Sequence, residues 1–178
     1  MSLLGDRLIE IHDALSAGNF PHAFGGAIAL AYCTGEPRGT RDLDVNVFTP
    51  PSRTGEVFDA LPDPVTITPA SIEAAERDGQ VRVWWDQTPI DIFLDTLRLH
   101  RQVASGVRQV PFDDRMIPVL DCTSLAIFKA LFDRTRDWAD IEAMVEAGQI
   151  DIGEAVSWVR EIAGAEAPEA HRLAALQK

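Results

Sequence analysis

The stretch from Phe24 to Phe48, FGGAIALAYCTGEPRGTRDLDVNVF, constrains the fold of this 178-residue chain more than any other part of it. Its pattern predicts a Gly-Gly turn, a short apolar helix, a polar loop and then a strand over residues 41–48. Asp42 and Asp44 share one face of that strand, because side chains two residues apart point the same way. Two carboxylates on one side repel each other, and a hard divalent cation that takes carboxylate oxygens removes the repulsion. We therefore expect a cation site on this strand.

A third acid lies further along the chain, inside a strand that is otherwise apolar. The runs VRVWW and PIDIFLDT, joined by Asp86-Gln87-Thr88, predict an antiparallel hairpin. Within it Asp91 alternates with core residues. Taken alone, Asp91 could occupy a solvent position on an edge strand. Because it follows an Asp-x-Asp strand, we favour a third carboxylate on a neighbouring strand.

The rest of the chain has helical and strand patterns that together predict an α+β fold. Helices are predicted over about residues 3–16, 27–32, 52–61, 68–77, 121–133, 136–147 and 151–163, with a final helix or frayed end after 167, and further strands over 22–24, 65–67 and 116–120. We expect a small mixed or antiparallel sheet flanked by helices over residues 1–112. A helical C-terminal part over residues 113–178 follows, either as an extension packed on it or as part of one compact domain.

Composition narrows the class of protein. The formal net charge of −12 argues against a surface that coats nucleic acid unspecifically. Cys33 and Cys122 are far apart and lack metal-ligand spacing, so we expect two buried free thiols, which fits a reducing cytoplasm. The N-terminus is amphipathic and carries acids, unlike a signal peptide, and no apolar run approaches the roughly 18 residues of a membrane span. We expect a cytoplasmic protein without a membrane partner.

One segment stands out against this acidity. Residues 96–112 contain Arg98, Arg101, Arg108 and His100 and no acid. One interpretation is a helix with a solvated basic face. The other is a contact surface for phosphates, with the three arginines touching an RNA acceptor.

The acids and glycines together resemble the signature of a known family. Gly25-Gly26 before a helix, Asp42-Leu43-Asp44 on the next strand and Asp91 on a later strand are similar to the DNA polymerase β-like nucleotidyltransferase superfamily. The form FGGAIALAY followed by PRGTRDLDV resembles the AbiEii-like branch, the toxin-type minimal nucleotidyltransferases. That branch also shows a lysine helix before an Arg-Asp…Asp helix, as in LAIFK and RDWAD here. The resemblance spans about residues 20–145 and implies a nucleotidyltransferase core over residues 1–112.

The resemblance implies an enzyme that transfers NMP from an NTP to an acceptor hydroxyl and releases pyrophosphate. Such enzymes use two Mg²⁺ ions, or Mn²⁺, which three carboxylates hold. The implied metal ligands are Asp42, Asp44 and Asp91, and the implied catalytic residues are these three and Lys129. The implied nucleotide-binding residues are Gly25, Gly26, Thr40, Arg41 and Lys129. Supporting roles are implied for Arg136, Asp137 and Asp140. Arg38 and Arg41 flank the acids and either contact the triphosphate or pair with a carboxylate, and the sequence leaves both options open.

Three interpretations of the acceptor remain open, beside one alternative without catalysis. An RNA acceptor, particularly the tRNA 3′ end, would make the protein a toxin with a cognate antitoxin, and the basic segment favours this. A small molecule such as an aminoglycoside is a polycation that would suit an acidic cleft. A protein acceptor, as for adenylylating antitoxins, is less favoured because those members usually show Gly-Ser. A non-catalytic module is disfavoured, because unneeded buried carboxylates cost stability. We favour a toxin-like enzyme that acts on RNA.

Overall fold

The computed structural model describes residues 3–177 of the chain. Contacts divide the chain into two compact units: residues up to 26 together with 39–119, and residues 27–38 together with 120–178. The first unit holds the whole sheet and the second is helical, which confirms the α+β class. The domain boundary after residue 112 stays a prediction.

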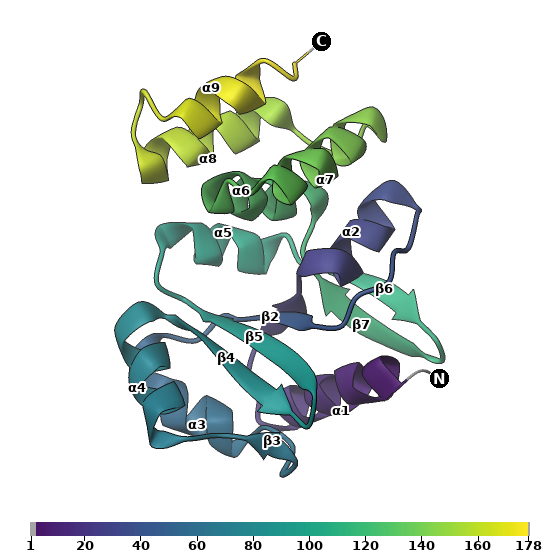
Figure 1. The fold of residues 1–178 in the computed structure, drawn as a ribbon, viewed down its shortest axis with the longest axis vertical. Coiled ribbons are helices and arrows are strands. Elements are labelled where there is room, and N and C mark those ends of the chain that lie inside the picture. The colour runs from purple at the N-terminus through teal and green to yellow at the C-terminus, as the bar shows by residue number, and fades with distance from the viewer. Residues whose placement is uncertain (1–2, 178) are drawn as a thin grey trace. The chain divides into compact units, whose positions relative to one another are not determined.

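The first unit is built on a mixed sheet that has seven strands within the described residues. The strands are β1 (His22–Phe24), β2 (Leu43–Val47), β3 (Val65–Thr66), β4 (Gln80–Trp85), β5 (Thr88–Leu94), β6 (Arg108–Phe112) and β7 (Arg115–Val119). Their order is β3-β4-β5-β2-β1-β7-β6. Figure 1 shows the hairpin pairs β4–β5 and β6–β7. The pairs β2–β5 and β1–β7 are parallel, and the other neighbours are antiparallel. β2 therefore lies at the centre, between β5 and β1.

The helices of the first unit lie close to the ranges that the sequence pattern predicts, and one of them lies in the basic segment, for which a helix was one of two interpretations. They are α1 (Leu3–Ala17), the 3₁₀ turn η1 (Pro51–Arg53), α3 (Thr54–Asp59), α4 (Pro69–Asp78) and α5 (Arg98–Ser105). Thr68 caps α4 by accepting from the Ser71 amide, and Gly79 ends it in the left-handed conformation, as expected from a Thr-Pro start and a glycine stop. The basic segment 96–112 forms α5 and then the edge strand β6, which the sequence did not predict as a strand.

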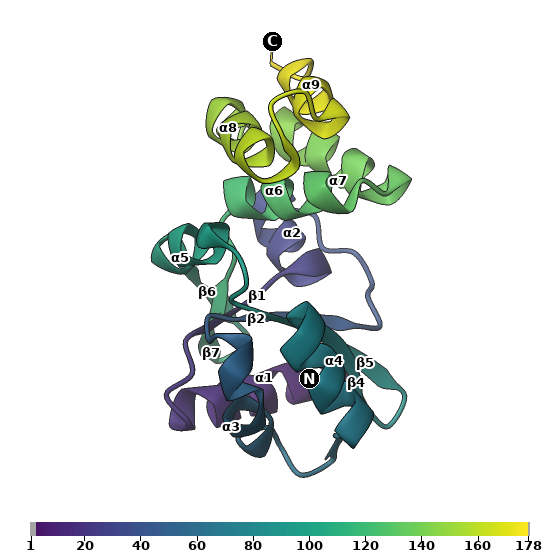
Figure 2. The same ribbon diagram turned by 90° about the vertical axis from the view of Figure 1, so that its left-hand side faces the viewer.

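The second unit is a helical bundle. It contains α2 (Gly26–Thr34), α6 (Cys122–Phe132), α7 (Thr135–Glu146), α8 (Ile152–Ala163) and α9 (Pro168–Ala174). The first residue of α2, Gly26, belongs to the first unit. Figure 2 shows α8 beside α9, and both pack on α6. Asp121 caps α6 and Asp151 caps α8, each by accepting an amide N–H from three residues on. Trp138 of α7 is fully buried in the core.

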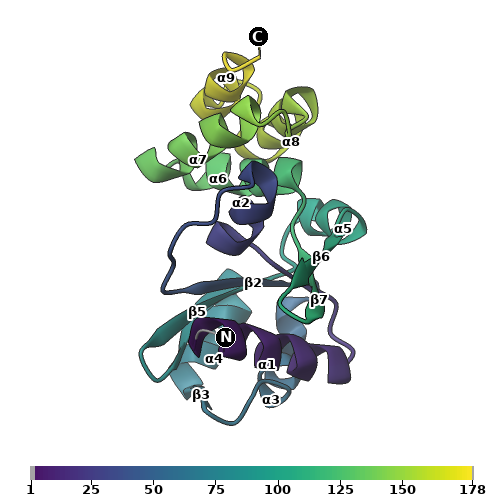
Figure 3. The same ribbon diagram turned by 90° about the vertical axis from the view of Figure 1, so that its right-hand side faces the viewer.

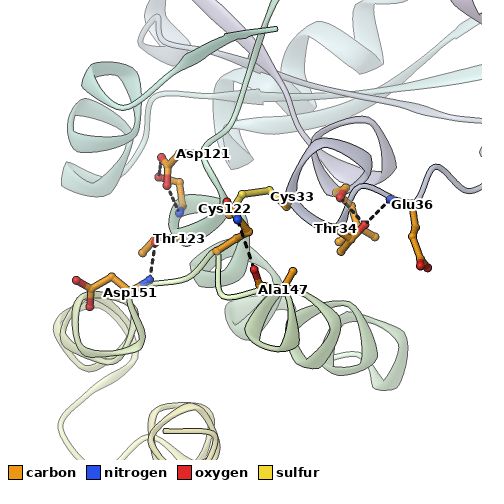
Figure 4. The surroundings of a disulfide bond; sticks show 11 residues. Cys33, Thr34, Glu36, Asp121, Cys122, Thr123, Ala147 and Asp151 are labelled. Atoms are coloured by element: carbon orange, nitrogen blue, oxygen red, sulfur yellow. Dashed lines mark hydrogen bonds between the residues drawn. A yellow bond between two sulfur atoms is a disulfide. The ribbon is translucent and has the colours of Figure 1, made fainter. Parts of the chain in front are cut away.

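The two cysteines correct the expectation of free thiols. Cys33 near the end of α2 and Cys122 at the start of α6 form a disulfide, with their Cα atoms 5.6 Å apart (Figure 4). Burial was predicted correctly, since each residue is 3% exposed. The pairing was missed because 89 residues separate the two, and only the packing of α2 within the helical unit brings them together. Among residues 3–177, no helix combines the length and apolarity that crossing a membrane requires.

Candidate active site

The glycine turn and the central strand meet at the carboxylate of Asp44. The Gly25 amide donates to the Asp44 carbonyl oxygen at 2.9 Å. Gly26 begins α2 with a φ of +49°, and a Cβ added there would lie 1.8 Å from Asp44 Oδ2. Only glycine therefore permits the carboxylate to lie this close to the backbone at the start of the helix. Helix N-termini also favour anions, since their first amides point outward.

Two of the three predicted acids, Asp44 and Asp91, lie on neighbouring strands, and Asp42 lies just before one of them, because β2 begins at Leu43 and not at residue 41. Strands β2 and β5 are parallel neighbours (Figure 3). Asp44 is in register with Asp91 in this pair, so both side chains are on one face of the sheet. Asp42 immediately precedes β2 and is two residues from Asp44. All three are half-buried, while the intervening residues of both strands, such as Leu43 and Ile92, belong to the core. The structure thus confirms the alternation from which the site was predicted.

Arg82 of β4 is a member of this site that the sequence did not identify. In the antiparallel β4–β5 hairpin Arg82 is opposite Asp91. Its Nε donates to Asp91 Oδ1 at 2.7 Å and its Nη2 to Oδ2 at 2.6 Å, so the pair is bidentate. The hydrogen bonds to Asp91 raise the pKa of Arg82, and the charges of Asp91, Asp42 and Asp44 add to this while partial burial opposes it. One guanidinium therefore interacts with all three carboxylates.

Thr40 and Arg41 lie just before the acids. The Thr40 hydroxyl donates to Asp42 Oδ1 at 2.5 Å and also lies 3.4 Å from the Asp42 amide, which donates to it. Thr40 thus orients Asp42. Arg41 is exposed. The nucleotide contacts expected of these two residues stay predictions.

The donor chemistry of the site fits a hard divalent cation. Carboxylates are the side chains that Mg²⁺ and Mn²⁺ prefer, and one of these three, Asp91, already holds a cationic group, the Arg82 guanidinium. Within the described residues, no three His, Cys, Asp or Glu side chains are arranged as a preformed metal site. Both oxygens of Asp91 accept from Arg82, and Oδ1 of Asp42 accepts from Thr40. The number of ions stays a prediction.

Lys129 and its partners form a buried network in the second unit. The Lys129 ammonium donates to Asp137 Oδ1 at 3.0 Å and to Asp140 Oδ2 at 2.7 Å. Arg38 also bonds Asp140, at 2.9 Å, and Arg134 bonds Asp137, at 2.8 Å. The lysine and both aspartates are at most 7% exposed. The aspartates therefore orient cationic partners, and Arg38 pairs with a carboxylate.

Four further predicted residues, and Lys129 itself, have roles that the structure leaves as predictions. Arg136 is exposed at the start of α7. Arg98 and Arg101 are exposed on α5, whose other face buries Leu99 and Val103. Arg108 is exposed at the start of β6, so all three arginines of the basic segment are on the surface of the first unit. Their contact with RNA stays a prediction, as does that of Lys129 with the nucleotide.

No protein-family model matches the sequence, and no curated protein matches it. Similar solved structures include the antibiotic-resistance factor ANT(2″)-Ia in solution, with a TM-score of 0.62 and 14% identity over 98% of this chain and 95% of that one. A crystal structure of ANT(2″)-Ia with adenylyl-2″-tobramycin gives 0.59 and 15%, over 99% and 98%. The lincomycin-bound lincosamide antibiotic adenylyltransferase LnuA gives 0.55 and 15%, over 80% and 96%. At such identities these likenesses show the fold alone, and that fold is the nucleotidyltransferase fold.

Proposed function

We propose that this protein is a metal-dependent nucleotidyltransferase that moves NMP from an NTP to an acceptor hydroxyl. One observation carries the proposal: Asp44 lies against Gly26 at a helix start, in register with Asp91 on the adjacent parallel strand. This combination joins a phosphate-binding turn to a carboxylate set for cations. The likeness to ANT(2″)-Ia over 99% of this chain and to the lincosamide adenylyltransferase LnuA over 80% supports it.

Each residue of the site has a distinct task in this reaction. Asp42, Asp44 and Asp91 would hold the cation, which when bound neutralises the triphosphate charge and polarises the reacting phosphate. The backbone N–H group of Gly26, at the start of α2, orients a phosphate oxygen. Gly25 holds the turn in place, because its own N–H donates to the Asp44 carbonyl oxygen. Asp91 accepts the proton of the acceptor hydroxyl, whose oxygen bonds to the α-phosphorus as the bond to pyrophosphate breaks. Thr40 fixes the rotamer of Asp42.

A small hydroxylated molecule is the acceptor that we favour. Two features support it: the net charge of −12, which suits a cationic acceptor, and the fold shared with enzymes whose structures hold adenylyl-tobramycin or lincomycin. This replaces the RNA acceptor as the first choice.

RNA remains the second candidate because one observation favours it. Arg98, Arg101 and Arg108 are exposed in a segment without acids. The AbiEii-like toxin role and an antitoxin partner depend on this second candidate.

The test is a labelling experiment with the full chain. Each of the four NTPs, labelled at the α-phosphate, is incubated with Mg²⁺ and an aminoglycoside, a lincosamide, total RNA or lysate protein. Label is expected in a small molecule, with equal release of pyrophosphate. Asp44→Asn should abolish transfer, whereas Asp63→Asn, which changes an exposed acid outside the site, should not.

The outcomes separate the acceptors. Label in RNA alone would overturn the small-molecule acceptor and leave nucleotidyl transfer standing. Full activity of Asp44→Asn would remove the proposed site. If no acceptor is labelled with any NTP, nucleotidyl transfer itself is wrong.

A further inference from the structure

The pair of Arg82 and Asp91 sets a condition on cation binding. Both carboxylate oxygens of Asp91 are used by the guanidinium, at 2.7 and 2.6 Å. A divalent cation at Asp91 needs a lone pair on the same oxygens, at roughly 2.0–2.1 Å for Mg²⁺. A guanidinium and a metal ion cannot both approach the same edge of one carboxylate, because their positive charges repel at that separation. Arg82 must therefore leave or rotate when a cation binds at the edge of Asp91 that the guanidinium occupies.

The two partners differ in how easily they move. The Arg82 side chain is 50% exposed and is attached to the surface of β4, so water can solvate it after it swings out. The Asp91 side chain is only 20% exposed and comes from the middle of β5, between the core residues Ile90 and Ile92. The arginine is consequently the mobile partner, and the carboxylate keeps its place for the cation.

The charges in this part of the sheet favour the same conclusion. Asp42, Asp44 and Asp91 carry three negative charges, and Arg82 interacts with each of them. Without a counter-cation, the in-register pair of Asp44 and Asp91 would repel across adjacent strands. Arg82 relieves this repulsion in the protein without its metal.

We propose that Arg82 is a positioning residue that serves as a built-in counter-cation, competing with the divalent cation for Asp91 and thereby setting the cation concentration at which the site assembles. The proposal rests on the proposed function, because it presumes that the carboxylates bind a metal ion. It predicts that loss of Arg82 strengthens metal binding. A residue that served only to stabilise the site or to bind the triphosphate would not have this effect.

The test measures Mn²⁺ affinity directly, from the signal of free Mn²⁺ in electron paramagnetic resonance, with the full chain. Arg82→Gln should bind Mn²⁺ about fivefold more tightly, which corresponds to about 1 kcal/mol for a partly exposed bidentate pair. The matched control is Arg77→Gln, since Arg77 makes an equally bidentate pair with Asp78 on the exposed end of α4. Its Mn²⁺ affinity should equal that of the wild type. Arg82→Lys, which keeps the charge but not the fork, should fall between wild type and Arg82→Gln.

Each outcome bears on the proposal. Unchanged or weaker Mn²⁺ binding by Arg82→Gln, in a protein that still unfolds cooperatively, overturns it and leaves the metal site intact. A rise in the NTP Michaelis constant without a change in Mn²⁺ affinity would make Arg82 a triphosphate ligand and overturn it as well. If wild type, Arg82→Gln and Asp91→Asn all fail to bind Mn²⁺, even with a non-hydrolysable NTP analogue, the proposed function fails and the competition with it.

Discussion

Replacing Gly26 with alanine should disable the candidate site. The new Cβ would lie 1.8 Å from Asp44 Oδ2 and 2.6 Å from its Cγ. Real Cβ atoms do not approach heavy atoms within 3.0 Å, so the carboxylate must shift by about 1.2 Å. Asp44 is in register with Asp91, and the shift therefore alters the geometry of the proposed metal site.

Two separate magnitudes follow from this geometry. An alanine at a φ of +49° costs about 1–2 kcal/mol of stability, because a Cβ is strained in the left-handed region. A displacement of about 1 Å at a reacting centre lowers kcat/KM by about 100-fold, or about 2.7 kcal/mol of transition-state stabilisation. The second effect should also appear as weaker Mn²⁺ binding.

Gly148 provides the matched control. Its φ is +66° and an added Cβ would meet nothing within 4 Å, so Gly148→Ala introduces the backbone strain without the clash. Urea unfolding should show similar losses of stability for the two variants, while only Gly26→Ala should lose nucleotidyl transfer and Mn²⁺ affinity. If Gly26→Ala transfers nucleotide within about threefold of Gly148→Ala, the close approach of Asp44 to the helix start has no catalytic role.

Three further changes have defined outcomes. Cys33→Ser should lower the free energy of unfolding by about 4–5 kcal/mol in urea under oxidising conditions, because the disulfide closes a loop with a sequence separation of 89 residues; an equal stability would show that the bridge does not form in solution. Lys129→Met should cost about 3 kcal/mol, since it leaves two buried aspartates with one cationic partner each; a loss below about 1 kcal/mol would contradict a buried network. Burial lowers the pKa of His22, so the unfolded chain takes up a proton near pH 6.5 before the folded one does, and stability should fall as the pH drops below about 6.5. His22→Gln should reduce the slope of the free energy of unfolding against pH by up to about 1.4 kcal/mol per pH unit. Unfolding curves measured between about pH 7.5 and 5.5 give this slope, and an unchanged slope would mean that His22 is not the titrating group.

Local sequence signals predicted most of the elements and suggested three residues of the candidate site. The Thr68 cap and the Gly79 stop bound α4, and Asp121 begins α6, because each satisfies backbone groups within a few residues. The shared direction of Asp42 and Asp44 followed from strand alternation, which needs no knowledge of tertiary structure. The register of Asp44 with Asp91 comes instead from the pairing of β2 with β5.

Features that depend on register or on distant packing were not predicted. Arg82 lies opposite Asp91 only because the hairpin turn has two residues, 86 and 87; a three-residue turn that includes Thr88 gives a different partner. β6 was missed because Pro111 and its mixed polarity hide a strand pattern in an edge position. The disulfide depends on packing between helices distant in sequence, which no local pattern encodes.

The helical unit is discontinuous in sequence, and this has a consequence for synthesis. Residues 27–38 leave the ribosome long before residues 120–178, with which they form one unit. At about 5–20 residues per second, the 89 residues between Cys33 and Cys122 take roughly 4–18 s to translate. Throughout that interval α2 has an uncovered apolar side at Ala29 and Leu30, and Cys33 has no bonding partner from its own unit. The nascent chain is then most exposed to chaperones and to wrong thiol partners, so the timing of translation bears on its yield.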